Sequence, residues 1–326
     1  MGGKLAAIRW AIENTMIVRN GQRFFSLFCV ILILATTGCS PSVPPQVAGY
    51  VDLRNLRPLQ PVQQEISPLR VAVASVISPE GTVQSYEPLL SYLEAQFHRP
   101  VELIQRRTYL ETNELIAEGK VDLAFVCTSA YIAGHDDFGM ELLAAPQVNG
   151  KTIYYSLLIV PTDSPAQSMA DLQNKVFAFT DPISLSGREY PTYLVQQLGF
   201  DPDHFFSQTI FTYNHDEAIR AVANKLADGA AVDSLVYEFA IAHNPDLVQK
   251  VRVIYRSPPF GIPPVVVSPK LDENLKRELQ KVLLGMGDTP EGKKALEAIG
   301  VEKFTTIDDH AYDDVRSLLS DVAKTR

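Results

Sequence analysis

The chain of 326 residues has few cysteines, a single tryptophan and no excess of positive charge. Its three cysteines exclude a small fold held together by many disulfides. A net charge of -9 argues against a nucleic-acid-binding surface as the main function, because such surfaces are basic. The sequence also lacks the ~20-residue apolar run that a membrane-spanning helix needs. With 46% hydrophobic and 21% charged residues, the chain is neither disordered nor collagen-like, and it is long enough for two domains.

The beginning of the chain has the pattern of a secretory signal. Residues 24–37 form an uncharged apolar run that follows Arg19 and Arg23 and ends in small residues. The run is too short to span a bilayer. We therefore expect a signal peptide over residues 1–38, with Met16 as an alternative start that gives a signal of conventional length.

The end of this signal is similar to that of bacterial lipoproteins. Gly38-Cys39 stands where the lipidated cysteine of such proteins becomes the mature N-terminus. The pattern departs from those signals at Thr36, so plain secretion or a retained anchor stays an alternative. Residues 39–68 are rich in proline and glutamine, which predicts an extended tether. The expected location is the periplasmic or cell-surface side of a membrane, with a lipid anchor at Cys39.

From Leu69 onward the chain alternates between strand-like and helix-like segments. Helical periodicity occurs at residues 86–97, 216–226 and 271–284. The expected strands are residues 70–77, 121–126, 154–160, 176–180, 230–232, 251–255 and 265–267. This alternation predicts an α/β fold, and the length of about 250 residues predicts two lobes rather than one sheet.

Two segments of the chain echo one another. Residues 122–131 (DLAFVCTSAY) share Asp, Ala, Val, a hydroxyl residue and Tyr with residues 228–237 (DGAAVDSLVY) at the same offsets. Ligands of open α/β sheets bind beyond the carboxyl ends of the strands. The echo thus places Cys127, Thr128 and Ser129 on one side of a cleft and Asp233, Ser234 and Tyr237 on the other. Chance similarity of two strand–helix units is the alternative.

The segment Thr180-Asp-Pro-Ile-Ser-Leu-Ser-Gly187 carries the strongest chemical signal. It follows an expected strand and precedes a helical stretch. Serine and glycine at a helix start serve as simple capping residues in many proteins. The alternative is an oxyanion site, because a helix N-terminus presents unpaired N–H groups and two hydroxyls add further donors.

The succession of these motifs resembles the phosphate/phosphite/phosphonate-binding proteins of ABC transporters. The resemblance extends from about Leu69 to Ile307. The matching segments are 86–93, 121–124, 128–131, 163–164, 171–172, 181–187, 215–216 and 231–234. It implies a two-lobed periplasmic binding protein of type II-like fold, in which each lobe is a mixed sheet flanked by helices and a cleft separates the lobes.

The resemblance also implies the domain organisation and the function. Lobe one comprises residues 69–160 plus 265–326, lobe two comprises residues 161–264, and the chain crosses between them near residues 160–162 and 257–264. The cleft closes on a small oxyanion, such as phosphate, phosphite or a phosphonate, for delivery to an ABC transporter permease. The expected protein is a monomer without catalytic residues, cofactor, metal or nucleic-acid partner.

The implied ligand-binding residues come from both lobes. By matching motif they are Ser184, Ser186, Gly187, His215 and Asp233 of lobe two and Tyr86, Thr128 and Ser129 of lobe one. The sequence departs from the family at Leu185, where a hydroxyl residue is usual, so that one donor is missing.

A second departure from the family lies at Cys127, where transport members often have a small residue. A related branch senses arsenite through a cysteine, and thiolates suit soft ligands. Cys127 is therefore a candidate thiol ligand, and the alternative function is that of a ligand-binding partner of a membrane sensor histidine kinase. A buried structural cysteine is the simpler interpretation. An enzyme on this fold finds no support, because no nucleophile elbow or phosphate-binding loop is present.

Overall fold

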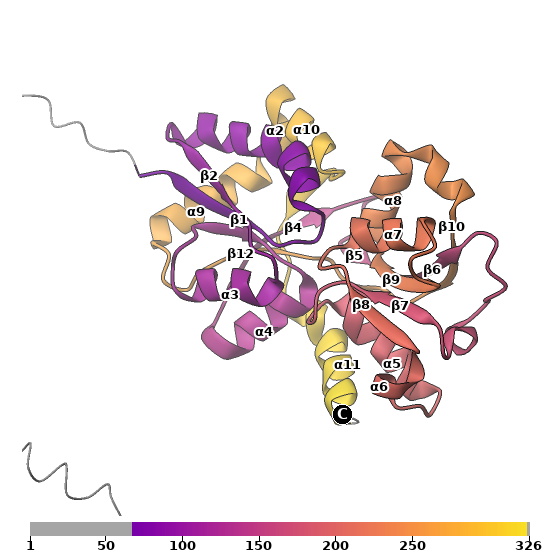
Figure 1. Cartoon of the computed structure of the whole chain (residues 1–326). Coiled ribbons are helices and arrows are strands. Elements are labelled where there is room, and N and C mark those ends of the chain that lie inside the picture. The colour runs from indigo at the N-terminus through magenta and orange to yellow at the C-terminus, as the bar shows by residue number, and fades with distance from the viewer. Residues whose placement is uncertain (1–66, 325–326) are drawn as a thin grey trace, which may run out of the picture. The chain divides into compact units, whose positions relative to one another are not determined.

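The computed structural model describes residues 67–324, whose strands form two main sheets with helices against their faces (Figure 1). The first sheet has the strand order β13-β4-β12-β3-β1-β2. Its strands are β1 (Leu69–Val73), β2 (Val101–Ile104), β3 (Leu123–Phe125), β4 (Glu141–Gln147), β12 (Val265–Val267) and β13 (Lys303–Thr305). Strands β1, β2 and β3 are parallel, whereas β12 and β13 run antiparallel to β4, so the sheet is mixed as predicted.

The second sheet is also mixed and has the order β10-β6-β9-β7-β8. Its strands are β6 (Ser156–Pro161), β7 (Val176–Phe179), β8 (Gln208–Phe211), β9 (Gly229–Asp233) and β10 (Val251–Arg256). Strand β7 is parallel to β8 and β9, while β6 is antiparallel to β9 and β10. We call the first sheet with its helices lobe one and the second sheet with its helices lobe two.

Helices fill the connections between the strands of each lobe. Those of lobe one are α2 (Pro79–Phe97), α3 (Tyr109–Ala117), α4 (Thr128–Phe138), α9 (Glu273–Leu284), η5 (Met286–Asp288) and α10 (Pro290–Ala298). Those of lobe two are η2 (Met169–Leu172), the π-helical turn η3 (Leu185–Glu189), α5 (Tyr190–Gln197), α6 (Pro202–Phe205), α7 (His215–Ala223), α8 (Ser234–His243) and η4 (Pro245–Gln249). The chain then ends in η6 (Asp309–Tyr312) and α11 (Asp313–Lys324).

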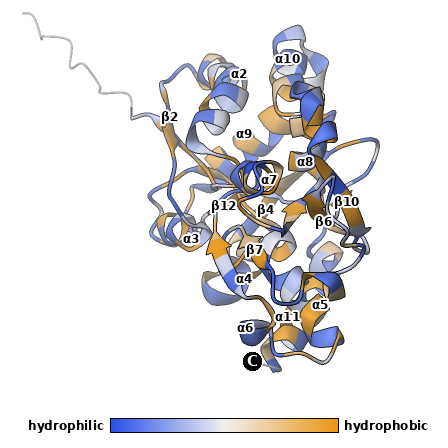
Figure 2. Ribbon diagram, turned by 45° about the vertical axis from the view of Figure 1, so that its right-hand side comes forward, coloured by the Kyte–Doolittle hydropathy of each residue, from blue (hydrophilic) through white to orange (hydrophobic). Residues whose placement is uncertain are grey.

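The strands form where apolar residues alternate between two covered faces. On β1, Val71 and Val73 pack with Leu89 and Leu93 of α2, whereas Ala72 faces the cluster built by α3 and α4. Figure 2 shows the resulting concentration of hydrophobic residues in strands such as β6, β7 and β12. The strand predicted over residues 70–77 ends early, because Val76 turns away from the sheet and its N–H bonds to the Ala74 carbonyl.

Helix α2 also differs from its prediction. It begins at Pro79 rather than near residue 86, since proline is well tolerated in the first turn of a helix.

The chain crosses between the lobes through a short two-stranded ribbon. Strand β5 (Ile153–Tyr154) pairs antiparallel with β11 (Phe260–Gly261). The next strand, β6, is fully buried and belongs entirely to the second sheet. The crossing predicted at residues 160–162 therefore lies earlier, before Ser156. Residues 156–161 pair with β9 and β10, so they already belong to lobe two.

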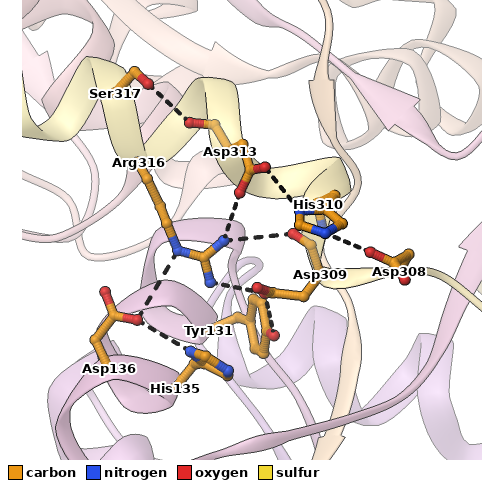
Figure 3. A network of polar contacts seen from close by, with 9 residues as sticks. All are labelled: Tyr131, His135, Asp136, Asp308, Asp309, His310, Asp313, Arg316 and Ser317. Atoms are coloured by element: carbon orange, nitrogen blue, oxygen red, sulfur yellow. Dashed lines mark hydrogen bonds and ion pairs between the residues drawn. The ribbon is translucent and has the colours of Figure 1, made fainter.

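The last helix contacts both lobes. Arg316 of α11 forms ion pairs with Asp309 and Asp313 and lies 3.9 Å from Asp136 of α4, while the Tyr131 hydroxyl donates to Asp309 (2.6 Å; Figure 3). On its other side, α11 packs against α5 of lobe two. The segment assigned to lobe one from sequence thus ends in a helix that bridges the two lobes.

The signal peptide, the tether and Cys39 fall outside the described residues. Over residues 67–324, no helix is both long and apolar enough to cross a membrane.

Candidate functional site

The carboxyl ends of strands from both lobes meet at one place, and direct hydrogen bonds join the lobes there. The Tyr109 N–H at the start of α3 donates to Asp181 Oδ2 beyond β7 (2.9 Å). The Ser129 hydroxyl in the first turn of α4 donates to the Ile183 carbonyl. All four residues come from segments that follow or face strand ends, as expected for a ligand site of an α/β protein. The lobes are therefore in contact across the site.

The start of α4 carries three of the predicted residues. Cys127 occupies the N-cap position, and no side chain caps this helix, in contrast to α8, where Asp233 caps the first turn. The Thr128 hydroxyl donates to the Gly261 carbonyl of the crossing ribbon (2.8 Å). The uncapped first turn leaves partial positive charge at the cleft, where an anion is stabilised.

The echo between the lobes is present in the structure. Cys127 and Asp233 are N-cap residues at the ends of β3 and β9, and each precedes a helix. Its outer members lie elsewhere: Tyr131 bonds to Asp309, and Tyr237 packs in the core of lobe two.

The predicted oxyanion motif forms the π-helical turn η3. Ser184 accepts a hydrogen bond from the Gly187 N–H (3.2 Å), so this hydroxyl serves as the cap. The Ser156 hydroxyl holds the Ser186 carbonyl (2.7 Å) and thereby fixes the turn. Gly187 is required by space, since a β-carbon there would lie 1.9 Å from Thr180 Oγ1. Within the motif, Ser184 therefore caps the η3 turn, whereas the side chain of Ser186 has no hydrogen-bond partner among the described residues.

Four buried hydroxyls at the cleft have no hydrogen-bond partner among the described residues. They belong to Tyr109, Tyr154, Thr180 and Ser186, each with no exposed surface. We call them the open hydroxyls, and we call those of Thr128, Ser129 and Ser184, which have partners, the engaged hydroxyls. A buried hydroxyl without a partner costs about 1–3 kcal/mol, and natural folds contain few of them. Their gathering at one place indicates a site built for hydrogen-bond acceptors.

The two buried phenols, Tyr109 and Tyr154, lie among other polar groups of the site. Burial raises the pKa of Tyr109 well above its ordinary value, and the nearby Cys127 and Asp181 add to that rise. Burial likewise raises the pKa of Tyr154, while the hydroxyls of Thr128 and Ser186 act on it in the opposite direction. Both phenols are therefore neutral at physiological pH and offer O–H donors.

Sequence reasoning missed Tyr109 and Tyr154 entirely, and it took Thr180 only as the start of the motif and not as a ligand-binding residue. Tyr109 is the first residue of α3 and lies inside the capping box formed by Thr108 and Glu111, and Tyr154 lies on the crossing strand β5. Neither position carries a recognisable motif. The Thr108–Glu111 capping box marks Tyr109 as the start of a helix, but it does not reveal which residues the Tyr109 ring faces.

His215 and Asp233 form a buried polar pair beside the open hydroxyls. The backbone N–H of Asp233 donates to His215 Nδ1 (3.0 Å). The backbone N–H of His215 donates to the Val76 carbonyl of lobe one (2.9 Å). Burial lowers the pKa of His215 to about 3. Burial raises the pKa of Asp233 to about 7, although the N–H groups of Leu235 and Val236 oppose the rise. His215 is therefore neutral, and the Asp233 carboxyl is partly protonated at neutral pH.

The remaining predicted residues border the site. Tyr86 of α2 packs edge-on against Phe125, with ring centroids 5.2 Å apart, and burial raises its pKa. Cys127 is 3% exposed, its Sγ lies 3.6 Å from Ser129 Oγ, and burial raises its pKa, which keeps it a thiol. Within residues 67–324, no group of histidine, cysteine and carboxylate side chains is placed to hold a metal ion.

A comparison with known protein families decides the class. Residues 71–312 match the family described as "ABC transporter, phosphonate, periplasmic substrate-binding protein". The chain belongs to this family. The two-lobed fold and the oxyanion-binding class predicted from the sequence are thereby confirmed, and the transport family gives no support to the sensor alternative.

The chain is also similar to individual members of this family and to solved structures. It is 26% identical to the phosphonates-binding periplasmic protein of Escherichia coli K12 over 268 residues, which is 81% of this chain and 79% of the relative. A binding-protein component of an ABC phosphonate transporter from Pseudomonas aeruginosa has a TM-score of 0.74 and 26% identity, with 79% and 87% of the chains covered. The Prochlorococcus marinus protein solved with methylphosphonate shares the fold, with a TM-score of 0.70, 19% identity and coverage of 78% and 98%.

Proposed function

We propose that this binding protein captures a phosphonate-type oxyanion between its lobes and delivers it to an ABC importer. The observation that carries the proposal is the set of open hydroxyls, Tyr109, Tyr154, Thr180 and Ser186, which are buried without partners. A tetrahedral oxyanion supplies several acceptor oxygens at one point, so one ligand satisfies donors that the protein leaves unpaired. Hydrogen bonds to a charged group contribute about 1.5–3 kcal/mol each.

The two lobes contribute different parts to this capture. Tyr109 and the uncapped start of α4 come from lobe one, Thr180 and Ser186 come from lobe two, and Tyr154 lies on the ribbon that links them. An anion bound to all of them holds the lobes together, which is how hinge closure couples to ligand binding. No covalent chemistry is needed, and we propose a non-catalytic role.

Isothermal titration calorimetry on the purified full chain tests this proposal with methylphosphonate, phosphate and sulfate. We expect binding of methylphosphonate or phosphate, and a loss of about tenfold or more in affinity in Ser186→Ala. Ser317→Ala is the matched control, because that exposed hydroxyl bonds only within α11. Unchanged affinity in Ser186→Ala, or binding of sulfate alone, contradicts the proposal.

We further propose that the mature protein is a monomer attached to the membrane through lipid on Cys39. The basis is the signal-like segment ending in Gly38-Cys39 and the proline-rich segment after it. Cell fractionation is the test: the natural chain is expected with membranes, and a Cys39→Ser variant is expected to be released or left unprocessed. Equal distribution of both chains argues for plain secretion.

A further inference from the structure

An apolar cavity borders the candidate site at Asp233, and none of the open hydroxyls is among the described residues that line it. Its volume is about 150 Å³, and apolar side chains such as Phe125, Val126, Phe239 and Phe304 line most of it. Its polar lining residues are Ser85, Tyr86 and Asp233. Residues from both lobes thus enclose a space that suits a carbon group rather than a polar one.

Two residues connect this cavity to the anion site. Asp233 lines the cavity and is the cross-strand partner of Ser156, whose hydroxyl donates to the Ser186 carbonyl (2.7 Å). Val126 lines the cavity and directly precedes Cys127, the N-cap of α4. The cavity therefore borders the anion site, where it can receive the remaining substituent of a ligand whose oxygens reach the open hydroxyls.

The charge of the lining argues against an ammonium substituent. Asp233 is the only carboxyl among the described residues that line this cavity, and its Oδ1 already accepts hydrogen bonds from the N–H groups of Leu235 and Val236, so only its Oδ2 is left for an ammonium group, which has three donors to satisfy. It is 3% exposed and serves the helix as a cap. An aliphatic or aromatic group finds many partners in the same space.

The size of the cavity indicates the size of the group. A cavity of ~150 Å³ lined by apolar side chains is large enough to bind benzene. The cavity also shares Ile77, Ser85, Val236 and Phe239 with a larger hollow of about 730 Å³ between α2 and helices α7 and α8, which gives longer groups a way toward solvent. A methyl group or a bare phosphate leaves most of this space empty.

We propose that this protein selects organophosphonates with an apolar substituent of about ring size, held in this cavity, over phosphate, methylphosphonate and aminoalkylphosphonates. The inference rests on the proposed function, because the phosphonate group must occupy the open hydroxyls. Each methylene moved from water into the cavity raises affinity about fourfold. Phenylphosphonate is therefore expected to bind at least ~10-fold more tightly than methylphosphonate.

Calorimetry on the full chain tests this with phosphate, methylphosphonate, 2-aminoethylphosphonate and phenylphosphonate. Ser85→Phe fills the cavity from α2 and is expected to abolish the preference for the phenyl compound while methylphosphonate affinity stays within threefold. Glu87→Phe adds the same ring at an exposed position of the same helix and is the control. Val301→Phe fills the cavity from the opposite side and replaces Ser85→Phe if that variant does not fold.

The outcomes separate the two proposals. Preference for phenylphosphonate that disappears in the filled variant but not in the control supports the inference. Tighter binding of 2-aminoethylphosphonate, or equal binding of the phenyl and methyl compounds, overturns it while leaving the proposed function intact. Absence of binding by every compound overturns both.

Discussion

The cleft contains two sets of hydroxyls that differ in whether the fold already uses them. The engaged hydroxyls of Thr128, Ser129 and Ser184 bond to backbone groups of the ribbon, of the opposite lobe and of their own turn. The open hydroxyls, in contrast, are equally buried and make no hydrogen bond of good geometry with the described residues, although those of Tyr154 and Ser186 lie close enough to influence each other. Within the engaged set, the Ser129 hydroxyl joins the two lobes, whereas those of Thr128 and Ser184 fix the ribbon contact and the η3 turn. The open set leaves buried donors that an oxyanion would satisfy.

Under the proposed function, this difference would couple ligand binding to closure of the lobes. Without ligand, each open hydroxyl destabilises the closed arrangement, because water that solvates it in an open cleft has been removed. With an oxyanion present, the same groups become charge-assisted donors in a dry site, where hydrogen bonds are strongest. The Ser129 bond between the lobes is made by the protein itself, so we expect affinity to depend on the balance between this bond and the open hydroxyls.

The largest loss of affinity is expected from a variant that displaces two open hydroxyls at once. In Gly187→Ala the new β-carbon meets Thr180 Oγ1 at 1.9 Å, so η3 must shift and misplace both Thr180 and Ser186. We expect affinity for the phosphonate to fall about 100-fold or more, because two charge-assisted bonds are lost. Gly287→Ala is the control, since a β-carbon there meets no atom within 4 Å. Affinity within threefold of wild type in Gly187→Ala contradicts this account.

Removing one open hydroxyl is expected to move stability and affinity in opposite directions. Tyr154→Phe deletes a buried donor without a partner, so the ligand-free protein gains up to about 1–3 kcal/mol. The same change lowers ligand affinity about 10- to 100-fold. Thermal unfolding and calorimetry measure the two quantities.

A tyrosine with a partner provides the contrast for this test. Tyr312 is as fully buried as Tyr154, but its hydroxyl donates to the Ile262 carbonyl (3.0 Å). Tyr312→Phe is expected to lower stability and to leave affinity unchanged. If both variants lose stability, then Tyr154 is engaged and the division into two sets is wrong.

The sequence revealed the local part of this site and missed the part that depends on topology. Ser184, Ser186 and Gly187 lie in one motif after a strand, and its spacing offered two alternatives, capping residues or donors for an anion; the family resemblance favoured the second. Tyr109 and Tyr154 come from a helix start and a crossing strand that are far apart in the chain, and only the packing of the two lobes brings them together. Residues that belong to one turn are predictable from pattern, whereas partners set by lobe contact are not.

The same reasoning explains the roles of Thr128 and Ser129. The echo of strand–helix units correctly placed them at a strand end, but pattern cannot tell whether a hydroxyl already has a backbone partner. Their acceptors, Gly261 and Ile183, lie in distant segments that the lobe arrangement supplies. The structure therefore assigns both to the engaged set in this closed arrangement.

Breaking one engaged hydroxyl is expected to have a smaller effect. Ser129→Ala removes the bond to the Ile183 carbonyl of lobe two, which contributes about 1 kcal/mol to closure. Affinity should fall only about fivefold, and the stability of the ligand-free protein should fall rather than rise. A rise in unfolding temperature like that of Tyr154→Phe would place Ser129 among the open hydroxyls.

The smallest effect expected in the wild-type protein is the pH dependence that arises from His215 and Asp233. The pKa of His215 falls from 6.5 to about 3 in the folded protein, so its contribution to stability is lost as pH drops below 6.5 toward 3. The pKa of Asp233 rises from 3.8 to about 7, so its contribution is lost as pH rises from 3.8 toward 7. Between about pH 4 and 6.5 the two slopes cancel, because folding moves one proton from the histidine to the carboxyl.

Single substitutions at this pair expose the two opposite slopes. Asp233→Asn keeps a capping oxygen, and its stability relative to wild type should rise with pH between about 4 and 6.5, because only the His215 slope remains. His215→Asn should show the reverse, a relative fall in stability over the same range. Denaturant unfolding at a series of pH values measures both differences. Parallel curves for the wild type and both variants would mean that neither group changes its proton affinity on folding, and that the buried pair beside the open hydroxyls is not the electrostatic unit described here.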